Sequence, residues 1–351
     1  ATPPRRRRAS PAGAPRRAPL ACWVRWLSWG YLGLALVAWL AVWVLAERWW
    51  PATVYLFGPR WLVILPLALL IPAAVLLDRR SLAPLGLAGI VVLFPVLGLC
   101  AAGLPGAAGK RSPDDLRVVT LNAAGRPEVA AKLAPLLAEW RPDIVAVQEC
   151  GPLLDGGASA LPGWHAHAEG GLCLLSRYPI RAAVPMNRDA FAEVRERGLG
   201  GSGGAVRYLL EAPGRPLRLA NVHLETPRKG LEGVRFRLGA GRMAENTMLR
   251  EMESRQVFRW VGPEEASLVV AGDFNMPVES RIYRATWGTL TNAFSAAGWG
   301  FGRTRDNGWI QVRIDHVLAG SGWRVRRAWV GPDVGSDHRP VVADLRRREE
   351  R

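Results

Sequence analysis

The chain has 351 residues, of which 49% are apolar, and its 46 basic and 30 acidic residues give a formal net charge of +16. This length allows one large domain and a smaller appendage. A basic chain attracts nucleic acids, anionic lipids and phosphorylated substrates alike, so charge alone does not select the partner. The four cysteines show no CxxC or Cys/His spacing, which argues against a zinc site.

Three apolar runs occupy the first part of the chain. They predict transmembrane helices at about 23–46, 61–77 and 82–104, because a bilayer core of about 30 Å requires about twenty apolar residues per helix. We therefore expect an all-α membrane region at 23–105, after a basic tail at 1–22. A secretory signal peptide is the alternative for the first run, but that run is too long for a typical one and two more follow.

Arginines predict the orientation of these helices. Seven arginines precede or begin the first helix, and Arg79 and Arg80 lie between the second and the third. Positively charged segments stay in the cytoplasm, so the N-terminus and the second connection are predicted to be cytoplasmic. Three crossings then place the chain from about residue 106 outside the cytoplasm, in the periplasm or at the cell exterior. A segment rich in Gly, Ala and Pro, at 106–114, is predicted to be a linker.

The remaining chain, 115–346, alternates predicted strands with helices and loops. Apolar, β-branched runs predict strands that end near Asn122 and Glu149, with a helix at 128–140 between them. A long helical region is expected at 231–260. Further antiparallel strands are predicted at 164–168, 171–176, 206–211 and 217–224. These elements predict a two-sheet α/β sandwich with its active site at one edge of the sheets.

Polar side chains stand where the predicted strands end. They are Asn122, Glu149, Asn221, His223, Asp273, Asn275, Asp315, Asp337 and His338. Strand ends brought together would place carboxylates, amides and imidazoles in one cleft, a set that suits metal-assisted attack on a phosphate ester. Taken alone, the Gly-Asp-Phe-Asn run at 272–275 also suits a simple turn, because Asp and Asn are common turn residues.

This ordered set of motifs resembles the endonuclease/exonuclease/phosphatase superfamily, the Mg-dependent hydrolases related to DNase I. The resemblance covers roughly residues 115–346. It implies a DNase I-like sandwich and a hydrolase that uses Mg²⁺, with Mn²⁺ as a candidate substitute. It also implies metal contacts from Glu149, Asn122 and Asp337.

The resemblance further implies catalytic roles. His338 would take a proton from water or stabilise the pentacovalent phosphate, and Asp315 would hold its imidazole in one tautomer. Asp273 and Asn275 would orient the attacking water and bind phosphoryl oxygens. His223 would bind a phosphate oxygen or protonate the leaving group, with a structural strand histidine as the alternative.

Other residues are weaker candidates. Asn221 shares a strand face with His223 and, with Asn275 and Arg207, is a candidate for substrate binding. Family nucleases often follow their first-strand Asn with an acid, whereas Ala123 and Ala124 follow it here, which argues for a single metal ion.

Cys150 and Cys173 belong to strands that are neighbours in the family, so an extracytoplasmic disulfide is an option. Two buried free thiols are the interpretation that we favour from the sequence.

The apolar helices and the runs at 221–228 and 335–340 resemble the membrane-anchored branch that includes the VanJ-type teicoplanin-resistance proteins. This resemblance implies the membrane bilayer as a partner and a lipid-linked substrate, such as a polyprenyl phosphate or pyrophosphate. The alternatives are an anchored nuclease, although residues suited to groove contacts are sparse, and a phospholipid or sphingolipid phosphodiesterase. A non-catalytic binding protein would have lost some of the catalytic residues, and all are present. The sequence does not predict an oligomeric state.

Overall fold

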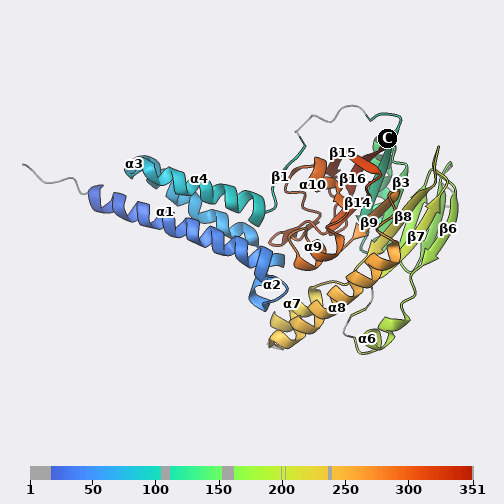
Figure 1. Ribbon diagram of the computed structural model, residues 1–351, viewed down its shortest axis with the longest axis horizontal. Helices are drawn as coiled ribbons and strands as arrows, with labels where there is room; N and C mark the ends of the chain where they lie inside the picture. Colours follow the sequence, from blue (N-terminus) through green and yellow to red (C-terminus); the bar gives the residue numbers. More distant parts are fainter. Residues whose placement is uncertain are drawn as a thin grey trace, which may run out of the picture. The chain divides into compact units, whose positions relative to one another are not determined.

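The computed structural model describes residues 17–103, 111–151, 162–198, 200–201, 203–235 and 239–349 (Figure 1). Most of the predicted tail, 1–16, and part of the predicted linker, up to 110, lie outside the described residues. The chain divides into two compact units, each described here by itself. One comprises Ala1–Trp39 and Trp61–Leu93, and the other Leu40–Arg60 and Phe94–Arg351.

The first unit is helical and contains α1 (Arg17–Leu40, which ends just beyond it), α3 (Leu65–Leu77) and α4 (Leu82–Val91). In the described part of the chain, three helical segments are long and apolar enough to cross a membrane. They are Pro19–Leu45, Arg60–Leu77 and Arg79–Val96. Three such segments near the N-terminus indicate association with a membrane.

The third apolar helix ends earlier than the sequence predicts. The prediction placed its end at residue 104, whereas the helical segment ends at Val96. Gly98 has a φ of +74°, a left-handed conformation that does not continue a helix. The strand β1 (Cys100–Ala101) then pairs with β11 (Trp299–Gly300), so the last residues of the predicted helix belong to the second unit.

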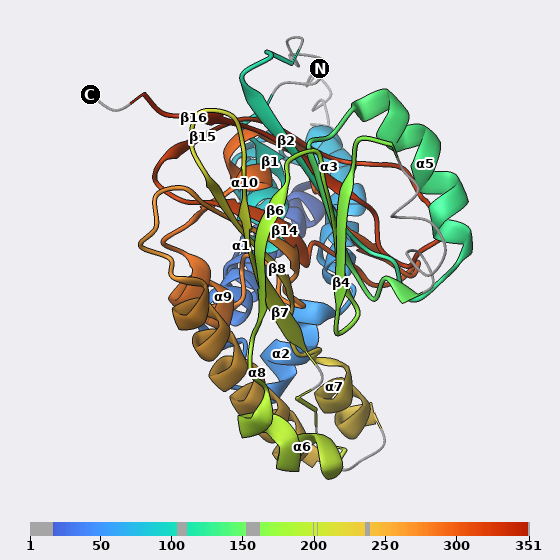
Figure 2. The same ribbon diagram turned by 90° about the vertical axis from the view of Figure 1, so that its right-hand side faces the viewer.

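Within the described residues, the second unit contains two six-stranded mixed sheets that form an α/β sandwich (Figures 1 and 2). The first sheet comprises β2 (Asp115–Asn122), β3 (Ile144–Gln148), β4 (His165–Glu169), β5 (Leu172–Ser176), β15 (Trp323–Val330) and β16 (Val341–Arg347), in the order β15-β16-β2-β3-β5-β4. The second comprises β6 (Ile180–Pro185), β7 (Gly204–Leu210), β8 (Leu217–His223), β9 (Leu268–Asp273), β10 (Thr291–Asn292) and β14 (Asp315–Ala319), in the order β10-β14-β9-β8-β7-β6. This architecture confirms the predicted fold class.

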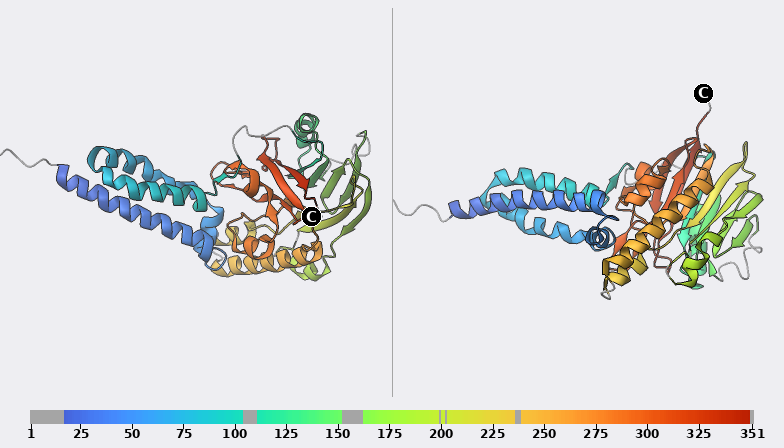
Figure 3. Two further views of the ribbon diagram at one scale, coloured as in Figure 1. Left: turned by 45° about the horizontal axis from the view of Figure 1, so that its top comes forward. Right: turned by 60° about the horizontal axis from the view of Figure 1, so that its bottom comes forward.

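Both faces of the central strands are buried, which explains their nearly continuous apolar sequences. Within β2, Val118 faces the core between the sheets and Val119 packs under α5 (Glu128–Trp140). Two helices, α8 (Gly239–Val261) and α9 (Arg281–Trp287), cover the outer face of the second sheet (Figures 2 and 3). Three buried apolar layers, one between the sheets and one on the outer face of each sheet, thereby hold the strand ends that carry polar residues.

Shorter elements complete the second unit. They are α2 (Trp50–Phe57), α6 (Ala192–Glu196), α7 (Arg228–Arg235), α10 (Ala293–Ala297), β12 (Arg305–Asp306) and β13 (Gln311–Val312). The helical region predicted at 231–260 consists of α7 and α8, and 236–238 between them lie outside the described residues.

Cys150 and Cys173 of the second unit form a disulfide, so the interpretation as free thiols is wrong. The Cα atoms of Cys150 and Cys173 lie 6.0 Å apart. In the antiparallel pair of β3 and β5, Val147 lies opposite Cys173. Glu149 then adopts a φ of +46° and turns the chain at the end of β3, where Cys150 donates its backbone N–H to Gly171. This turn, which brings the thiols together, is not evident from the sequence.

We expect the disulfide to contribute to stability. Replacing both Cys150 and Cys173 by Ala should lower the free energy of unfolding by about 3 kcal/mol, because the bond spans 23 residues and restricts the unfolded chain. Thermal unfolding of the full chain in detergent, with and without reductant, measures this effect. Reductant should lower the melting temperature of the wild type and leave the double variant unchanged. Equal melting of the wild type in both conditions would contradict the prediction.

Candidate active site

Strand register brings three of the predicted site residues together. β9 lies between β8 and β14, and Asp273 is its last residue. In this register Asp273 pairs with Asp315 of antiparallel β14 and with His223 of parallel β8. Residues directly opposite one another on neighbouring strands place their side chains on the same face of the sheet and in contact range. The site therefore begins as a row of acid, acid and histidine across one sheet.

The other sheet contributes an amide and a carboxylate. Asn122, the last residue of β2, donates from Nδ2 to Oε1 of Glu149 and to Oδ2 of Asp273, both at 3.0 Å. Asn122 thus connects the two sheets at the edge where their strands end. Glu149 has the left-handed backbone described above, and its side chain is 47% exposed. Of these groups, Glu149 is the one most open to solvent and ligands.

Asp273 is the buried centre of the site. Its Oδ2 lies 3.7 Å from Nε2 of His223 and 3.8 Å from Nε2 of His338. Burial, and then the negative charge of Asp315, raise the pKa of Asp273, whereas the two histidines and Asn122 oppose that rise. Added positive charge near Asp273 would therefore stabilise its ionised form.

His338 is held by Asp315 as predicted. Its Nδ1 lies 2.8 Å and 3.1 Å from the two carboxylate oxygens of Asp315. Nη1 of Arg305 lies 2.8 Å from Nε2, and because a guanidinium only donates, this contact fits the neutral imidazole with its hydrogen on Nδ1. Burial alone would lower the pKa of His338, but the charges of Asp315 and Asp273 raise it to about 9, with Arg305 opposing them. The two carboxylates thus favour the protonated ring, Arg305 favours the neutral one, and Asp315 fixes the orientation of the imidazole.

The Gly-Asp-Phe-Asn run forms a turn, as one interpretation predicts, and it also places Asn275 at the candidate site, as the other predicts. The backbone N–H of Asn275 donates to Oδ1 of Asp273 at 2.8 Å, which is a turn stabilised by an Asp side chain. Its φ of +51° is tolerated by Asn, and its Nδ2 donates to the carbonyl of Leu224 at 2.9 Å. The turn fixes Asn275 beside Asp273, where both line the same pocket.

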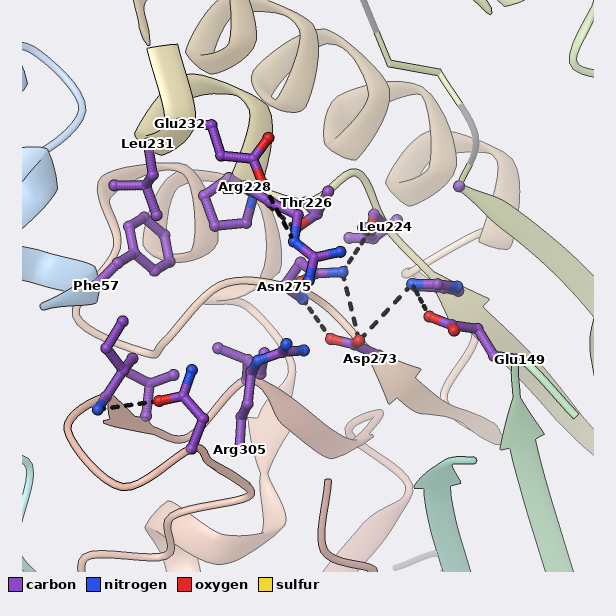
Figure 4. A pocket seen from close by; sticks show the side chains of 17 residues that line it. Phe57, Glu149, Leu224, Thr226, Arg228, Leu231, Glu232, Asp273, Asn275 and Arg305 are labelled. Atoms are coloured by element: carbon purple, nitrogen blue, oxygen red, sulfur yellow. Dashed lines mark hydrogen bonds and ion pairs between the residues drawn. The ribbon is translucent and has the colours of Figure 1, made fainter. Parts of the chain in front are cut away.

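Several of these side chains line a pocket of about 450 Å³, whereas Asn122, Asp315 and His338 are not among its lining residues (Figure 4). Its polar part contains Glu149, His223, Asp273, Asn275 and Arg305. Apolar lining comes from Phe57, Leu224, Pro227, Leu231, Ile310, Val312 and Ile314, and the polar residues Thr226, Arg228, Glu232 and Asn307 line the pocket as well. The pocket therefore combines charged groups suited to a phosphate group with apolar surface that includes Phe57 and Leu231 on one side (Figure 4).

The structure places Asn221 away from this pocket. Its side chain is fully buried between the sheets and donates to the carbonyls of Val147 at 3.1 Å and Cys173 at 3.0 Å. Its Oδ1 accepts from Gln148 at 2.6 Å. These contacts account for all of its polar atoms, so its position supports a role in joining the sheets and not in substrate binding.

Two other predicted residues also have different contacts. Arg207 donates to the carbonyl of Trp260 at 2.7 Å, and its guanidinium lies 4.4 Å from the centre of that ring, outside the pocket lining. Asp337 pairs with Nη2 of Arg305 at 2.8 Å. In this structure Asp337 therefore forms an ion pair with Arg305, and its predicted contact with a metal stays a prediction.

Arg305 is the site residue that the sequence prediction missed. It belongs to the two-residue strand β12, and its backbone forms an isolated bridge with His338. No apolar run or motif surrounds Arg305, so the sequence carries no local signal for its role.

The acidic groups fit a divalent cation. Glu149 and Asp273 both contact the amide of Asn122 and both lie within 3.7 Å of Nε2 of His223, so their oxygens converge. Asp273, Asp315 and His338 also offer ligand atoms that lie within 4.8 Å of one another. Carboxylate oxygens are the ligands that hard divalent cations prefer. Glu149 and Asp273 would hold such an ion, which would neutralise the charge of a bound phosphate, whereas Asn122 donates from Nδ2 to both carboxylates and its predicted metal contact stays a prediction.

The fold and this site belong to a known class. Residues 119–338 match the sequence profile of the Endonuclease/Exonuclease/phosphatase family, and the chain is a member of that family. It is a phosphate ester hydrolase, and enzymes of this family typically depend on a divalent metal. No curated protein matches the chain significantly.

Two of the solved structures that are similar to this chain illustrate the likeness. One is a humanized TDP2 from D. rerio with 14 mutations, at 16% identity and a TM-score of 0.52, covering 66% of this chain and 99% of that one. The other is the human Nocturnin catalytic domain with a bound sulfate anion, at 18% identity and a TM-score of 0.50, covering 68% and 97%. At this identity the likeness shows a shared fold.

We expect His338→Ala to lower kcat by about 10²–10⁴-fold, which is the typical contribution of a general base. Asp315→Asn should lower kcat as well, because the amide removes the charge that orients the imidazole and raises its pKa. Phosphate release from the active substrate measures both effects. Asp114→Asn, at an exposed position, is the matched control and should retain full activity. Full activity of both site variants would exclude His338 as the base.

We also expect Glu149→Gln to raise the divalent metal concentration needed for half-maximal activity by about 10–100-fold. The amide keeps the size of the side chain but removes a negatively charged ligand oxygen. The measurement is activity as a function of metal concentration, together with calorimetric titration of the metal. Glu139→Gln, on the exposed face of α5, is the control. An unchanged metal dependence of Glu149→Gln would remove Glu149 from the metal site.

Proposed function

We propose that the protein is a membrane-anchored, Mg²⁺-dependent phosphoesterase that hydrolyses a lipid-linked phosphate or pyrophosphate, of the polyprenyl type, at the outer face of the membrane. The observation that carries this proposal is the mixed lining of the pocket. Its charged groups include Asp273 and Glu149, and its apolar surface includes Phe57, which belongs to the segment between the first two apolar helices. A phosphate joined to a hydrocarbon chain matches both.

The chemistry proposed for this site is hydrolysis by water. Water would attack phosphorus and form the new P–O bond, while the bond from phosphorus to the leaving oxygen breaks. His338 would accept the proton of the attacking water at Nε2, and Asp315 would stabilise the imidazolium. His223, whose Nε2 faces Glu149 and Asp273, would bind a phosphate oxygen or protonate the leaving group. Arg305 would bind the phosphate charge.

Two observations support an extracytoplasmic position of the enzyme unit. Residues 40–60, which connect the first two apolar helices, pack in the same compact unit as the chain after residue 94. Both would lie on one side of a membrane crossed by three helices, as the arginine distribution predicts. The disulfide of Cys150 and Cys173 also favours an oxidising compartment outside the cytoplasm.

We predict that the full chain in detergent micelles with Mg²⁺ releases phosphate from a polyprenyl pyrophosphate and leaves plasmid DNA intact. Removal of the metal by a chelator should abolish activity, Mg²⁺ should restore it, and Mn²⁺ should restore at least part of it. His338→Ala is the control that separates this activity from a contaminant.

Other outcomes would change the proposed substrate. Cleavage of DNA that His338→Ala abolishes, without phosphate release from the lipid, would make the protein an anchored nuclease. Release of a phosphorylated headgroup from a phospholipid or a sphingolipid, under the same control, would make it a phosphodiesterase. The apolar surface of the pocket accepts acyl chains as readily as isoprenoid chains, which is why this assay belongs in the first experiment.

A further inference from the structure

The segment between the first two apolar helices is built into the enzyme unit. It contains α2, and its residues Ala46, Leu56 and Phe57 form a buried apolar cluster against which Leu231 of α7 packs. All of these residues belong to the second compact unit. A connection of this length between two helices would need no such contacts if it served only to reverse the chain.

A buried ion pair fixes this segment. Glu47 accepts hydrogen bonds from Oγ of Ser280, at 2.7 and 2.9 Å, and from the backbone N–H of Ile282 at 2.9 Å. Its carboxylate also lies 3.2 Å from Nη1 of Arg250, and the two side chains are at most 1% exposed. Two charges buried at this depth are tolerated only when each is paired and hydrogen-bonded. The segment is therefore held in one position relative to α8 and α9.

The same arginine connects the segment to the active site. Nη2 of Arg250 donates to the carbonyl of Asn275 at 3.2 Å, and the backbone N–H of Asn275 donates to Asp273. The ring of Phe57 lies under the guanidinium of Arg250, with its centre 5.0 Å from Cζ. Phe57 is thus positioned by the group that also supports the catalytic turn.

Phe57 forms part of the pocket wall. In Figure 4, Phe57 and Leu231 lie next to each other on one side of the pocket, and Asp273 and Glu149 lie on the other. A substrate with its phosphate at the acidic side extends its ester chain toward the apolar side. Ile310 and Val312 add apolar surface to the pocket, and Arg228, Glu232 and Asn307 are polar residues of the same lining.

We propose that Phe57 is a specificity-determining residue, which contacts the hydrocarbon chain next to the phosphate and so selects lipid-linked over short, water-soluble substrates. The inference rests on the proposed function. It gives the segment between the apolar helices a role in substrate recognition, in addition to its role as a connection. Contact with a few methylene groups in an apolar pocket is worth about 10–200-fold in kcat/KM.

The test compares two pyrophosphates that share their reacting group and differ in chain length. A fragment that begins after the helices lacks Phe57, so the full chain in micelles is used. It is assayed with a long-chain polyprenyl pyrophosphate and with dimethylallyl pyrophosphate. Phe57→Ala should lower kcat/KM for the long chain about tenfold or more, and should change that for the short chain by less than about twofold. Phe57→Leu should retain most of the preference, because it keeps an apolar wall.

Two further variants guard against an effect on folding. Leu231→Ala shortens the same wall from α7 and should reduce the preference in the same direction. Tyr55→Ala removes a ring from the same helix and cluster, outside the pocket lining of the described residues, and should keep the preference of the wild type.

The outcomes separate this inference from the proposed function. A wild type that hydrolyses neither pyrophosphate contradicts the proposed function itself. A wild type that prefers the long chain, with the same preference in Phe57→Ala and Leu231→Ala, overturns the inference alone. Equal losses on both substrates in Phe57→Ala also overturn it, because they would show a structural and not a selective role.

Discussion

The site depends on one buried carboxylate. Asp273 is only 1% exposed and lies opposite a second acid, Asp315, so burial and repulsion both oppose its ionised form. Its neighbours compensate through two imidazoles and the amide of Asn122. An arrangement that needs additional positive charge binds a divalent cation well, and this need links the fold of the strands to the metal-dependent chemistry of the family.

Cross-sheet contacts explain why the site requires the complete sandwich. Asn122 of one sheet donates to Asp273 of the other, and Asn221 and Gln148 join the sheets in the layer beneath. A polar network of this kind is stable only when each member is satisfied. The amides therefore have two roles, because Asn122 at the edge contacts the carboxylates of the site, whereas Asn221 and Gln148 hold the sheets together.

The apolar N-terminal region also contributes a segment to the second unit. Its first connection supplies the buried Glu47, which pairs with Arg250, and Arg250 in turn supports the turn at Asn275. The second unit is thus discontinuous in sequence, since more than thirty residues separate its first segment, Leu40–Arg60, from the rest of it. The pocket wall at Phe57 therefore forms only when Leu40–Arg60 packs with the rest of the second unit.

Residues at strand ends could be predicted from the sequence, because alternation and apolar runs mark where strands stop. The helix at Glu128–Trp140 could be predicted as well. The sequence therefore determined the fold class, the apolar helices and the candidate site residues at strand boundaries, such as Asp273 at the end of β9 and His338 shortly before β16. Tertiary structure alone decided the contributions of Arg305 and Phe57, because both reach the site from segments without a periodic pattern. It also decided that Asn221 joins the sheets and that Cys150 and Cys173 form a disulfide. Both outcomes depend on which side chains meet across sheets and turns, and local sequence does not encode the distances between distant segments.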